Sequence, residues 1–474
     1  MKKIVEKHPL AIRWFHWINF PILAIMIWSG LLIYWANDIY KIRIGGNTLI
    51  HFFPESFYKQ LNIPYRLSEG MAFHFVFMWL FFGNGLLYVL YTTISGEWRF
   101  LVPNRQSFKE AWQILLHDLH LRKSAPPPAK YNGAQKIAYS AIIVMGLGSL
   151  LTGLAIYKPV QFYWLCALFG GYETSRMIHF ILTIGYCLFF VIHIAQVLRA
   201  GWNNFRAMVA GFEVVKQQKK QLTTDQQVRR QIQRRTFLSF AGFLLLGGAA
   251  WKGWFWLKNQ PGDQGLKGGV QEPLRKVLNA NERAFQHALS PGHLAKTYPQ
   301  SAALRHVRVN GDIGLDKTDF DPAKWTLDVT RANNRILSIT LDQIKQLPKT
   351  EIVFDFKCIE GWSMITHWGG VKFSDFMKAF QLDAEAAMRY IGLMTPDQDY
   401  YVGIDMPSAM HPQTLLCYEM NGQPLTSDHG YPLRLIIPVK YGVKNLKRIG
   451  SLYFSDDRPD DYWFERGYDY FSGL

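Results

Sequence analysis

The strongest constraint on this chain is an apolar run over residues 178–198 that carries a histidine near each end, His179 and His193. Arg176 and Arg199 bound the run, which is long enough to cross the roughly 30 Å hydrocarbon core of a bilayer as one helix. At about 100° and 1.5 Å per residue, both imidazoles leave the same helix face, roughly 21 Å apart along the axis. Ionisable side chains inside a span usually serve a function, and axial ligation of haem iron is one such function. Interfacial histidines bonded to the backbone are the alternative for either ring alone.

Three earlier apolar runs are also long enough to span a bilayer, and two of them carry a histidine near their start. These runs cover approximately residues 12–35, 71–94 and 137–157, with His16 in the first and His74 in the second. Lysines and arginines are concentrated before the first run, between the second and third, and after the fourth. By the positive-inside rule these basic segments, including the N-terminus, are cytoplasmic.

This orientation places the four histidines at two depths. His16 and His193 lie at the ends of runs that meet the cytoplasmic surface, whereas His74 and His179 lie near the outer surface. The sequence therefore predicts two b-type haems, an inner one held by His16 and His193 and an outer one held by His74 and His179. Iron held by two neutral imidazoles is suited to electron transfer, because it has no open coordination position for other chemistry.

A helix quartet with histidines so placed resembles the di-haem b-type cytochrome subunits of respiratory hydrogenases, formate dehydrogenases and thiosulfate reductases, over roughly residues 7–210. The resemblance implies that residues 1–212 form a di-haem membrane cytochrome. It also implies electron transfer between a quinone near the inner haem and a partner at the outer surface. Three loop histidines, His51, His117 and His120, are expected to be solvated or interfacial.

Charge and cysteine content exclude several other classes of protein. The formal net charge is +16, but the basic residues flank apolar spans and form no recognisable nucleic-acid-binding tract. The chain has 4 cysteines and neither a CxxC nor a CxxCH motif, so a disulfide framework, a c-type haem and a cysteine-ligated iron–sulfur cluster lack support. A long apolar run directly follows Arg13, which favours a retained first span over a cleavable signal peptide.

Residues 213–236 are basic and are expected to form a cytoplasmic linker, and residues 237–258 a fifth span that delivers the rest of the chain to the outer side. The segment RRTFL at residues 234–238 is similar to a twin-arginine export signal. A positive flank that only orients the span is the alternative. A tether and N-terminal extension, residues 259–300, follow.

Residues 301–474 show short β-type runs separated by turn signals and short helices, which predicts a mixed α+β domain. The runs include residues 306–309, 325–329, 352–356 and 433–439. Cys358 follows one of these runs. Its thiolate could ligate a soft metal, and a buried structural cysteine is the alternative.

Three motifs accompany this cysteine: YEMNG at 418–422, DHGYPLR at 428–434 and KYGVKNLK at 440–447. Together with Cys358 they resemble the molybdenum-cofactor domain of the sulfite oxidase family. The resemblance implies that Cys358 binds molybdenum and is the catalytic residue. It also implies that the pterin and its phosphate contact five residues of the later motifs, namely His429, Arg434, Asn445, Leu446 and Lys447.

The sequence directly after the cysteine differs from that of sulfite oxidases. Gly361, Trp362 and Ser363 stand where those oxidases typically carry arginines, and residues 358–364 more closely resemble periplasmic methionine-sulfoxide reductases. Positive charge for a sulfite dianion is therefore not evident. Four nearby residues remain candidates either for the site or for structural roles, namely Glu360, His367, His411 and Cys417. Residues 281–298 are a candidate segment for further pterin contacts.

The fold class that follows is an N-terminal α-helical transmembrane bundle, with four haem-bundle helices and a fifth connecting span, joined to a C-terminal mixed α+β molybdopterin domain. The expected function is electron transfer from membrane quinol through two haems to molybdenum, reducing a small S-oxide or N-oxide. A dehydrogenase that oxidises sulfite or another oxyanion and feeds quinone is one alternative, and a non-catalytic electron-transfer module is another. The expected location is a bacterial inner membrane, with a cytoplasmic N-terminus and a periplasmic C-terminal domain. Membrane lipid is an expected partner, nucleic acid is not, and a homo-oligomer is compatible with the sequence.

Overall fold

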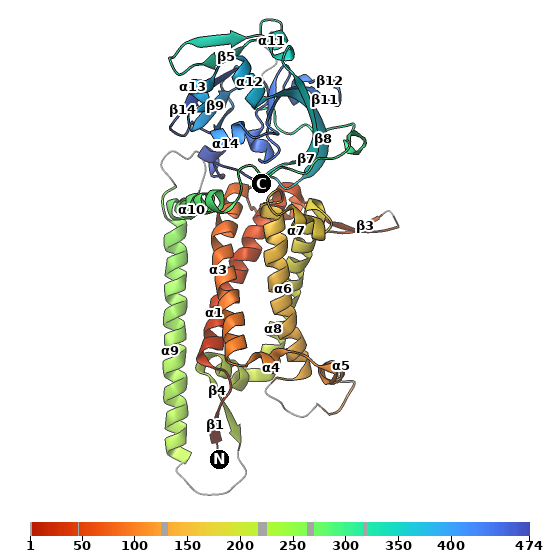
Figure 1. Cartoon of the computed structure of the whole chain (residues 1–474). Coiled ribbons are helices and arrows are strands. Elements are labelled where there is room, and N and C mark those ends of the chain that lie inside the picture. Colours follow the sequence, from red (N-terminus) through yellow and green to blue (C-terminus); the bar gives the residue numbers. More distant parts are fainter. Residues whose placement is uncertain (1, 46, 125–130, 217–224, 263–269, 316–319) are drawn as a thin grey trace. The chain divides into compact units, whose positions relative to one another are not determined.

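The computed structural model describes residues 2–45, 47–124, 131–216, 225–262, 270–315 and 320–474. The chain divides into two compact units. The first unit combines residues 1–28, 74–153 and 176–260, and the second combines residues 29–73, 154–175 and 261–474. Figure 1 labels many of the helices and strands of both.

Among the described residues, four helices are long and apolar enough to cross a membrane. They contain the four runs predicted from sequence, within a few residues for the first three: α1 (Leu10–Tyr34), α3 (Leu67–Ile94), α6 (Gly133–Tyr157) and α8 (Tyr172–Ala210). Few side chains in their apolar stretches are buried inside the described structure, so lipid can cover them, and the protein is a multi-pass membrane protein. The α8 ribbon extends past the predicted end of its span, but Gly201 interrupts it with a φ of 76°.

The predicted fifth span lies within α9 (Asp225–Lys258), one continuous helix. This helix is not among those that meet the length and hydropathy criteria within the described part of the chain, and its apolar run is interrupted by Lys252. Within the first unit, Phe243 of α9 packs on Trp17 with ring centroids 4.5 Å apart, and Phe240 packs on Trp202 at 5.1 Å. That α9 crosses the membrane stays a prediction.

Short elements complete the first unit. Strands β1 (Lys2–Glu6) and β4 (Phe212–Lys216) pair antiparallel, and the Arg13 guanidinium donates to the Val209 carbonyl at 2.7 Å. Two helices lie between α3 and α6, namely α4 (Trp98–Leu101) and α5 (Arg105–Asp118). Phe108 and Trp112 on α5 are exposed, as is usual for a helix at a membrane interface.

The second unit contains two five-stranded sheets. The first has the order β10-β9-β14-β5-β6, in which β14 is parallel to β5 and antiparallel to β9. The second has the order β12-β11-β8-β7, with β13 also paired to β11. The strands are β5 (Leu327–Thr330), β6 (Ile336–Ile339), β7 (Lys349–Lys357), β8 (Ser363–Lys372), β9 (Tyr390–Met394), β10 (Tyr401–Asp405), β11 (Leu415–Met420), β12 (Gln423–Pro424), β13 (Arg434–Ile436) and β14 (Ser451–Ser455).

The second unit also contains several helices and one hairpin that do not belong to these two sheets. The buried core draws on both sheets and includes Leu327, Ile391, Leu416 and Leu435, all 0% exposed. Alternating burial along β5 reflects one face turned to this core. The remaining elements are the hairpin β2 (Lys41–Ile44) and β3 (Asn47–His51), and helices α2 (Glu55–Gln60), α7 (Tyr163–Leu168), α10 (Glu272–Ala288), α11 (Leu341–Lys345), α12 (Phe373–Ala379), α13 (Asp383–Ala386) and α14 (Met406–Ala409).

The long β7–β8 hairpin sets the position of the cysteine. The ladder runs from the Lys349–Val371 pair to the Lys357–Ser363 pair and leaves residues 358–362 as the turn. Confirming the prediction for residues 352–356, β7 covers that whole run. The prediction of a strand at residues 306–309 is wrong: this segment pairs with no strand, and its residues Val307 and Arg308 line a cavity instead.

We expect Gly370→Ala to destabilise the second unit strongly. A Cβ at Gly370 would lie 2.1 Å from the Leu416 carbonyl oxygen and 2.6 Å from the Cys417 Cα, both in the backbone of the paired strand β11. Such overpacking should cost about 3 kcal/mol of unfolding free energy or more. Calorimetric melting of the full chain in detergent measures this loss. Gly292→Ala, where nothing lies within 4 Å, is the control, and equal melting of the two variants would contradict the prediction.

Candidate functional site

Two histidine pairs lie among the helices of the first unit. The rings of His16 on α1 and His193 on α8 have centroids 6.0 Å apart, inclined by 51°. The rings of His74 on α3 and His179 on α8 have centroids 6.2 Å apart, inclined by 69°. The structure therefore brings together the same two pairs that the charge bias predicts.

The spacing of these rings fits a metal held between them. Two metal–imidazole bonds of about 2 Å each, with about 1 Å from each nitrogen to its ring centre, require centroids roughly 6 Å apart. The Thr152 hydroxyl lies 2.9 Å from His179 Nδ1, a contact that orients the ring. Gly153 lies beside the same imidazole, so that a Cβ there would be 3.4 Å from it. Within the described residues no cluster of three or more His, Cys, Asp or Glu forms a metal site, and the pairs supply only two ligands each.

The second unit contains a cavity of about 290 Å³ at the turn of the β7–β8 hairpin. Aromatic rings and polar groups from widely separated segments line it. The polar and charged lining residues are Arg308, Asn310, Cys358, Glu360, Thr366, His429, Arg434, Asn445 and Lys447. The aromatic ones are Tyr65, Phe356, Trp362, Trp368, Tyr400, Trp463 and Tyr468.

Cys358 begins the hairpin turn and is only 4% exposed. Its N–H donates to the Trp362 carbonyl at 3.0 Å, and its carbonyl accepts from the Gly361 N–H at 2.9 Å. Gly361 has a φ of 95°, a conformation that favours glycine. Burial, followed by the nearby Glu360 carboxylate, raises the pKa of the Cys358 thiol to about 12. A bound cation would reverse this preference, because metal binding stabilises the thiolate.

Arg434 and His429 each present a nitrogen without a hydrogen-bond partner in the described structure. The Arg434 guanidinium donates to the carbonyls of His429 at 3.0 Å and Asn445 at 3.3 Å, but its Nε has no partner. His429 Nδ1 lies 2.8 Å from the Thr426 hydroxyl, and its buried Nε2 has no partner. Burial lowers the pKa of Arg434 to about 10. The Arg434 Nε–H is therefore a buried donor without a partner beside a cavity, and an anionic ligand would complete this arrangement.

The turn at residues 445–447 contributes in three different ways. Lys447 Nζ donates to the carbonyls of Asn310 at 3.0 Å and Gly311 at 2.8 Å, and burial lowers its pKa to about 8. Asn445 uses its amide to bond the Tyr441 carbonyl at 3.0 Å, so it also shapes the turn. Leu446 is fully buried and packs in the core. Asn445 and Lys447 therefore line the cavity, whereas Leu446 does not.

Several residues of the cavity were not singled out from sequence. Arg308 lies over the Trp362 ring at 4.9 Å and pairs with Glu360 at 4.0 Å. It was missed because residues 306–309 were interpreted as a strand. Tyr65 precedes α3, nearly 300 residues before Cys358 in the chain; no local motif marks it, since only folding brings the two segments together.

Other sequence candidates lie elsewhere or have structural partners. Glu360 lines the cavity and accepts a hydrogen bond from the Trp362 indole at 3.0 Å. His367 is buried and lies 3.3 Å from the Glu351 carboxylate. His411 and Cys417 are buried, at 2% and 0% exposed; neither is among the residues that line the cavity.

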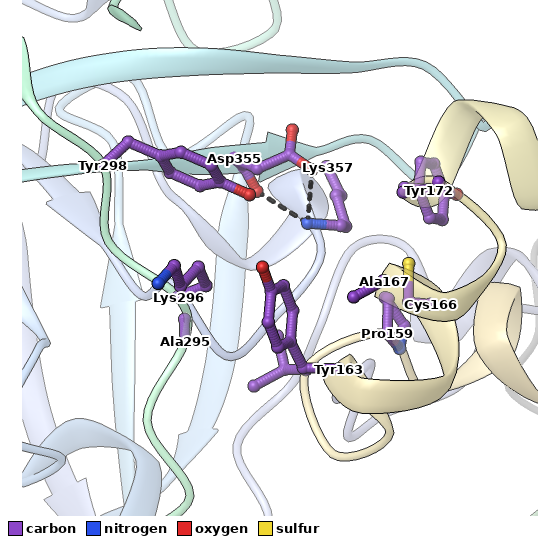
Figure 2. Close-up of a pocket in the computed structure, with 13 residues that line it drawn as sticks. Pro159, Tyr163, Cys166, Ala167, Tyr172, Ala295, Lys296, Tyr298, Asp355 and Lys357 are labelled. Atoms are coloured by element: carbon purple, nitrogen blue, oxygen red, sulfur yellow. Dashed lines mark hydrogen bonds and ion pairs between the residues drawn. The ribbon is translucent and has the colours of Figure 1, made fainter.

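A second pocket of about 280 Å³ lies on the opposite face of β7 (Figure 2). Asp355 and Lys357 line this pocket, whereas Phe356 and Cys358 line the first cavity, as alternation along the chain requires. The first cavity is not lined by any of the described residues 281–298, so their contact with the pterin stays a prediction. Instead Ala295, Lys296 and Tyr298 line this second pocket, with Tyr163, Cys166 and Tyr172.

Comparison with known proteins divides the chain in the same way. Residues 7–211 match the family model described as prokaryotic cytochrome b561, and residues 314–463 match the one described as oxidoreductase molybdopterin binding domain. The "Putative protein-methionine-sulfoxide reductase subunit YedZ1" of Azospira oryzae is 38% identical over 205 residues, which cover 43% of this chain and 77% of that protein.

The C-terminal part is similar to other proteins. The protein-methionine-sulfoxide reductase catalytic subunit MsrP of Xanthomonas axonopodis pv. citri is 32% identical over 176 residues, which cover 32% of this chain and 54% of that protein. The chain thus spans about half the length of this catalytic relative. A solved sulfane dehydrogenase SoxCD from Paracoccus pantotrophus covers 35% of this chain and 46% of its own with 18% identity and a TM-score of 0.27, which supports no conclusion about fold.

We expect the Cys358 thiol of cofactor-free protein to react slowly. With a pKa of about 12, only about one thiol in ten thousand is ionised at pH 8, and the thiolate is the reactive form. Alkylation by iodoacetamide, quantified on the Cys358 peptide by mass spectrometry, should be at least ~100-fold slower than in urea-unfolded chain. Equal rates in the folded and unfolded chain would show that the thiol is neither buried nor held protonated.

Proposed function

This chain belongs to the prokaryotic cytochrome b561 family over residues 7–211 and carries an oxidoreductase molybdopterin-binding domain over residues 314–463, and from that premise we propose that it is a quinol-dependent sulfoxide reductase. The protein is a molybdenum-dependent oxidoreductase of the membrane. One observation carries the rest of the proposal: paired histidine rings and a thiol-lined cavity occur in a single polypeptide.

The relatives support an S-oxide as the substrate. Both the YedZ1 and MsrP proteins are named as protein-methionine-sulfoxide reductase subunits. Reduction of a sulfoxide to a sulfide consumes two electrons and two protons and releases water. A quinol releases two electrons and two protons when it becomes a quinone, so the reaction balances without a further reactant. A small N-oxide is consumed with the same balance.

The cavity residues fit a molybdopterin that carries an anionic phosphate. When bound, this cofactor supplies a metal centre for oxygen-atom transfer. Cys358 holds the metal as a thiolate, a soft ligand that must lose its proton on binding. Arg434 and His429 direct their unpartnered nitrogens to the anionic part, and Lys447 adds a positive charge. Asn445 and Leu446 maintain the turn that positions Lys447.

The histidine pairs fit two b-type haems. His16 and His193 hold the inner haem and His74 and His179 the outer one, each haem carrying a single electron. Ring spacings of 6.0 Å and 6.2 Å support this assignment, and Thr152 fixes the orientation of the His179 ring. Two imidazoles per iron leave no open position, which favours electron transfer over other chemistry.

The charge distribution supports an orientation in the bacterial inner membrane. Basic residues follow the histidine-bearing α8 and precede α1, so we place these two basic flanks in the cytoplasm. The quinone then meets the protein at the cytoplasmic side of the membrane. The α9 helix then crosses the membrane and delivers the C-terminal domain to the periplasm. The Arg234-Arg235 pair, which directly precedes the apolar part of α9, supports export of a folded domain by the twin-arginine route.

A second candidate function is oxidation of an oxyanion such as sulfite, with electrons passed to quinone. Arg308 favours it, because this guanidinium lines the cavity although no arginine directly follows Cys358. Glu360 offsets part of its charge at 4.0 Å. Product assays with a reduced and an oxidised quinone analogue separate the two directions.

We expect His16→Ala and His179→Ala each to lower the haem content to roughly half, because each removes one of two ligands to one haem. The pyridine haemochrome absorbance of purified protein measures this content. His51→Ala, in an outer loop where the imidazole bonds the Asp38 carbonyl at 2.7 Å, is the control and should keep the full content. A full haem complement in His179→Ala would refute the outer site.

We expect Cys358→Ser to abolish sulfoxide reduction while the haem spectrum is kept. A hydroxyl is a poor ligand for a soft metal, so bound molybdenum should also fall. Reoxidation of reduced haem after addition of sulfoxide, with sulfide product and molybdenum quantified, is the measurement. Cys187→Ala on α8 is the matched control. Persistent sulfide formation in Cys358→Ser, or none in the unaltered protein with any sulfoxide or N-oxide, would overturn the proposed reaction.

A further inference from the structure

The first turn of α8 contacts both strands of the β7–β8 hairpin next to the turn that begins with Cys358. The Lys357–Ser363 pair is the last one of the β7–β8 ladder before the turn. The Glu173 carboxylate accepts a hydrogen bond from the Ser363 backbone N–H at 3.0 Å, and the Tyr172 ring centroid lies 5.6 Å from the Lys357 ammonium. Two consecutive residues of α8 therefore contact the two strands on either side of the Cys358 turn.

A short series of bonds joins Glu173 to the cysteine. Ser363, which donates to Glu173, directly follows Trp362 in the chain. The Trp362 carbonyl in turn accepts from the Cys358 N–H at 3.0 Å, and the Gly361 N–H closes the turn at 2.9 Å. A displacement of Ser363 would therefore reach the Cys358 backbone through one peptide unit and one hydrogen bond.

The contact on the other strand is largely buried. The Lys357 ammonium bonds the Asp355 carbonyl at 2.9 Å and lies 2.8 Å from the Asp355 carboxylate, and Figure 2 shows both side chains in one pocket with Tyr172. Lys357 is 8% exposed and Tyr172 is 5% exposed. A desolvated cation–ring contact is stronger than an exposed one, so Tyr172 supports the hold of Glu173 on the hairpin.

The helix that makes these contacts also carries two of the four paired histidines. His179 follows Glu173 by six residues and His193 by twenty, both within α8. Electron transfer slows steeply as the separation of two centres grows, so a fixed position of the thiol hairpin on this helix matters for its rate. We propose that Glu173 is a positioning residue that couples α8 to the Cys358 hairpin for electron delivery to the molybdenum domain. This inference rests on the proposed function.

The test compares Glu173→Ala and Glu173→Gln in full-length protein loaded with its cofactors. Each variant is assayed with a sulfoxide and two electron donors, a quinol analogue and a reduced viologen dye. We expect the ratio of quinol-driven to dye-driven rate to fall roughly tenfold in Glu173→Ala, the factor typical of one lost hydrogen bond to a charged group. Glu173→Gln should restore the ratio, because its amide oxygen still accepts from Ser363. Thr174→Ala, whose hydroxyl bonds the nearby Gly170 carbonyl at 3.1 Å, is the control.

A second measurement needs no cofactor. Alkylation of Cys358 in cofactor-free protein should be faster in Glu173→Ala than in the unaltered chain, and unchanged in Glu173→Gln, because a loosened hairpin exposes the thiol. An unchanged donor ratio in Glu173→Ala, or a proportional loss of both rates, overturns the inference. If the unaltered protein reduces no sulfoxide with either donor, the proposed function is overturned instead. In that case equal alkylation rates of Cys358 in all variants would also contradict the positioning role of Glu173.

Discussion

The pairing of β7 with β8 decides which side chains face the cavity of the second unit. Because the ladder ends at the Lys357–Ser363 pair, alternation turns Phe356 and Cys358 toward one cavity and Asp355 and Lys357 toward the pocket on the other face. A slip of one residue would exchange these faces and place an ammonium where the thiol lies. The close approach of Gly370 to the β11 backbone resists such a slip, since no side chain fits there.

Without its cofactor, the protein holds several buried polar groups near Cys358 in arrangements that destabilise the fold. Arg434 and His429 each retain a buried nitrogen without a partner in the described structure, and burial moves the pKa of Cys358 upward and that of Lys447 downward. Unpaired buried polar groups and buried charges both reduce stability. An anionic ligand with a metal would relieve all of these costs together, so binding of the cofactor should also stabilise the folded domain.

Much of this organisation was accessible from sequence because it depends on short-range patterns. Apolar runs of sufficient length predict the four spans, and charge bias with helical geometry pairs His16 with His193 and His74 with His179. The structure brings the same rings together. Motifs around Cys358, His429 and Arg434 predicted a shared site, and these three residues line one cavity. The strand expected at residues 306–309 was wrong, because short β-type runs do not by themselves show which edge they pair with.

Sequence alone thus determined the spans, the pairing of the four histidines and the cysteine-centred motifs, since each follows from local composition, spacing or a contiguous match. Tertiary structure alone decided that Tyr65 and Arg308 enter the cavity, that Leu446 leaves it for the core, and that Glu173 bonds the Ser363 backbone. Such contacts join segments that are hundreds of residues apart or use backbone groups that every residue carries. No local pattern marks them, because their energy arises only when the packed chain excludes water from both partners.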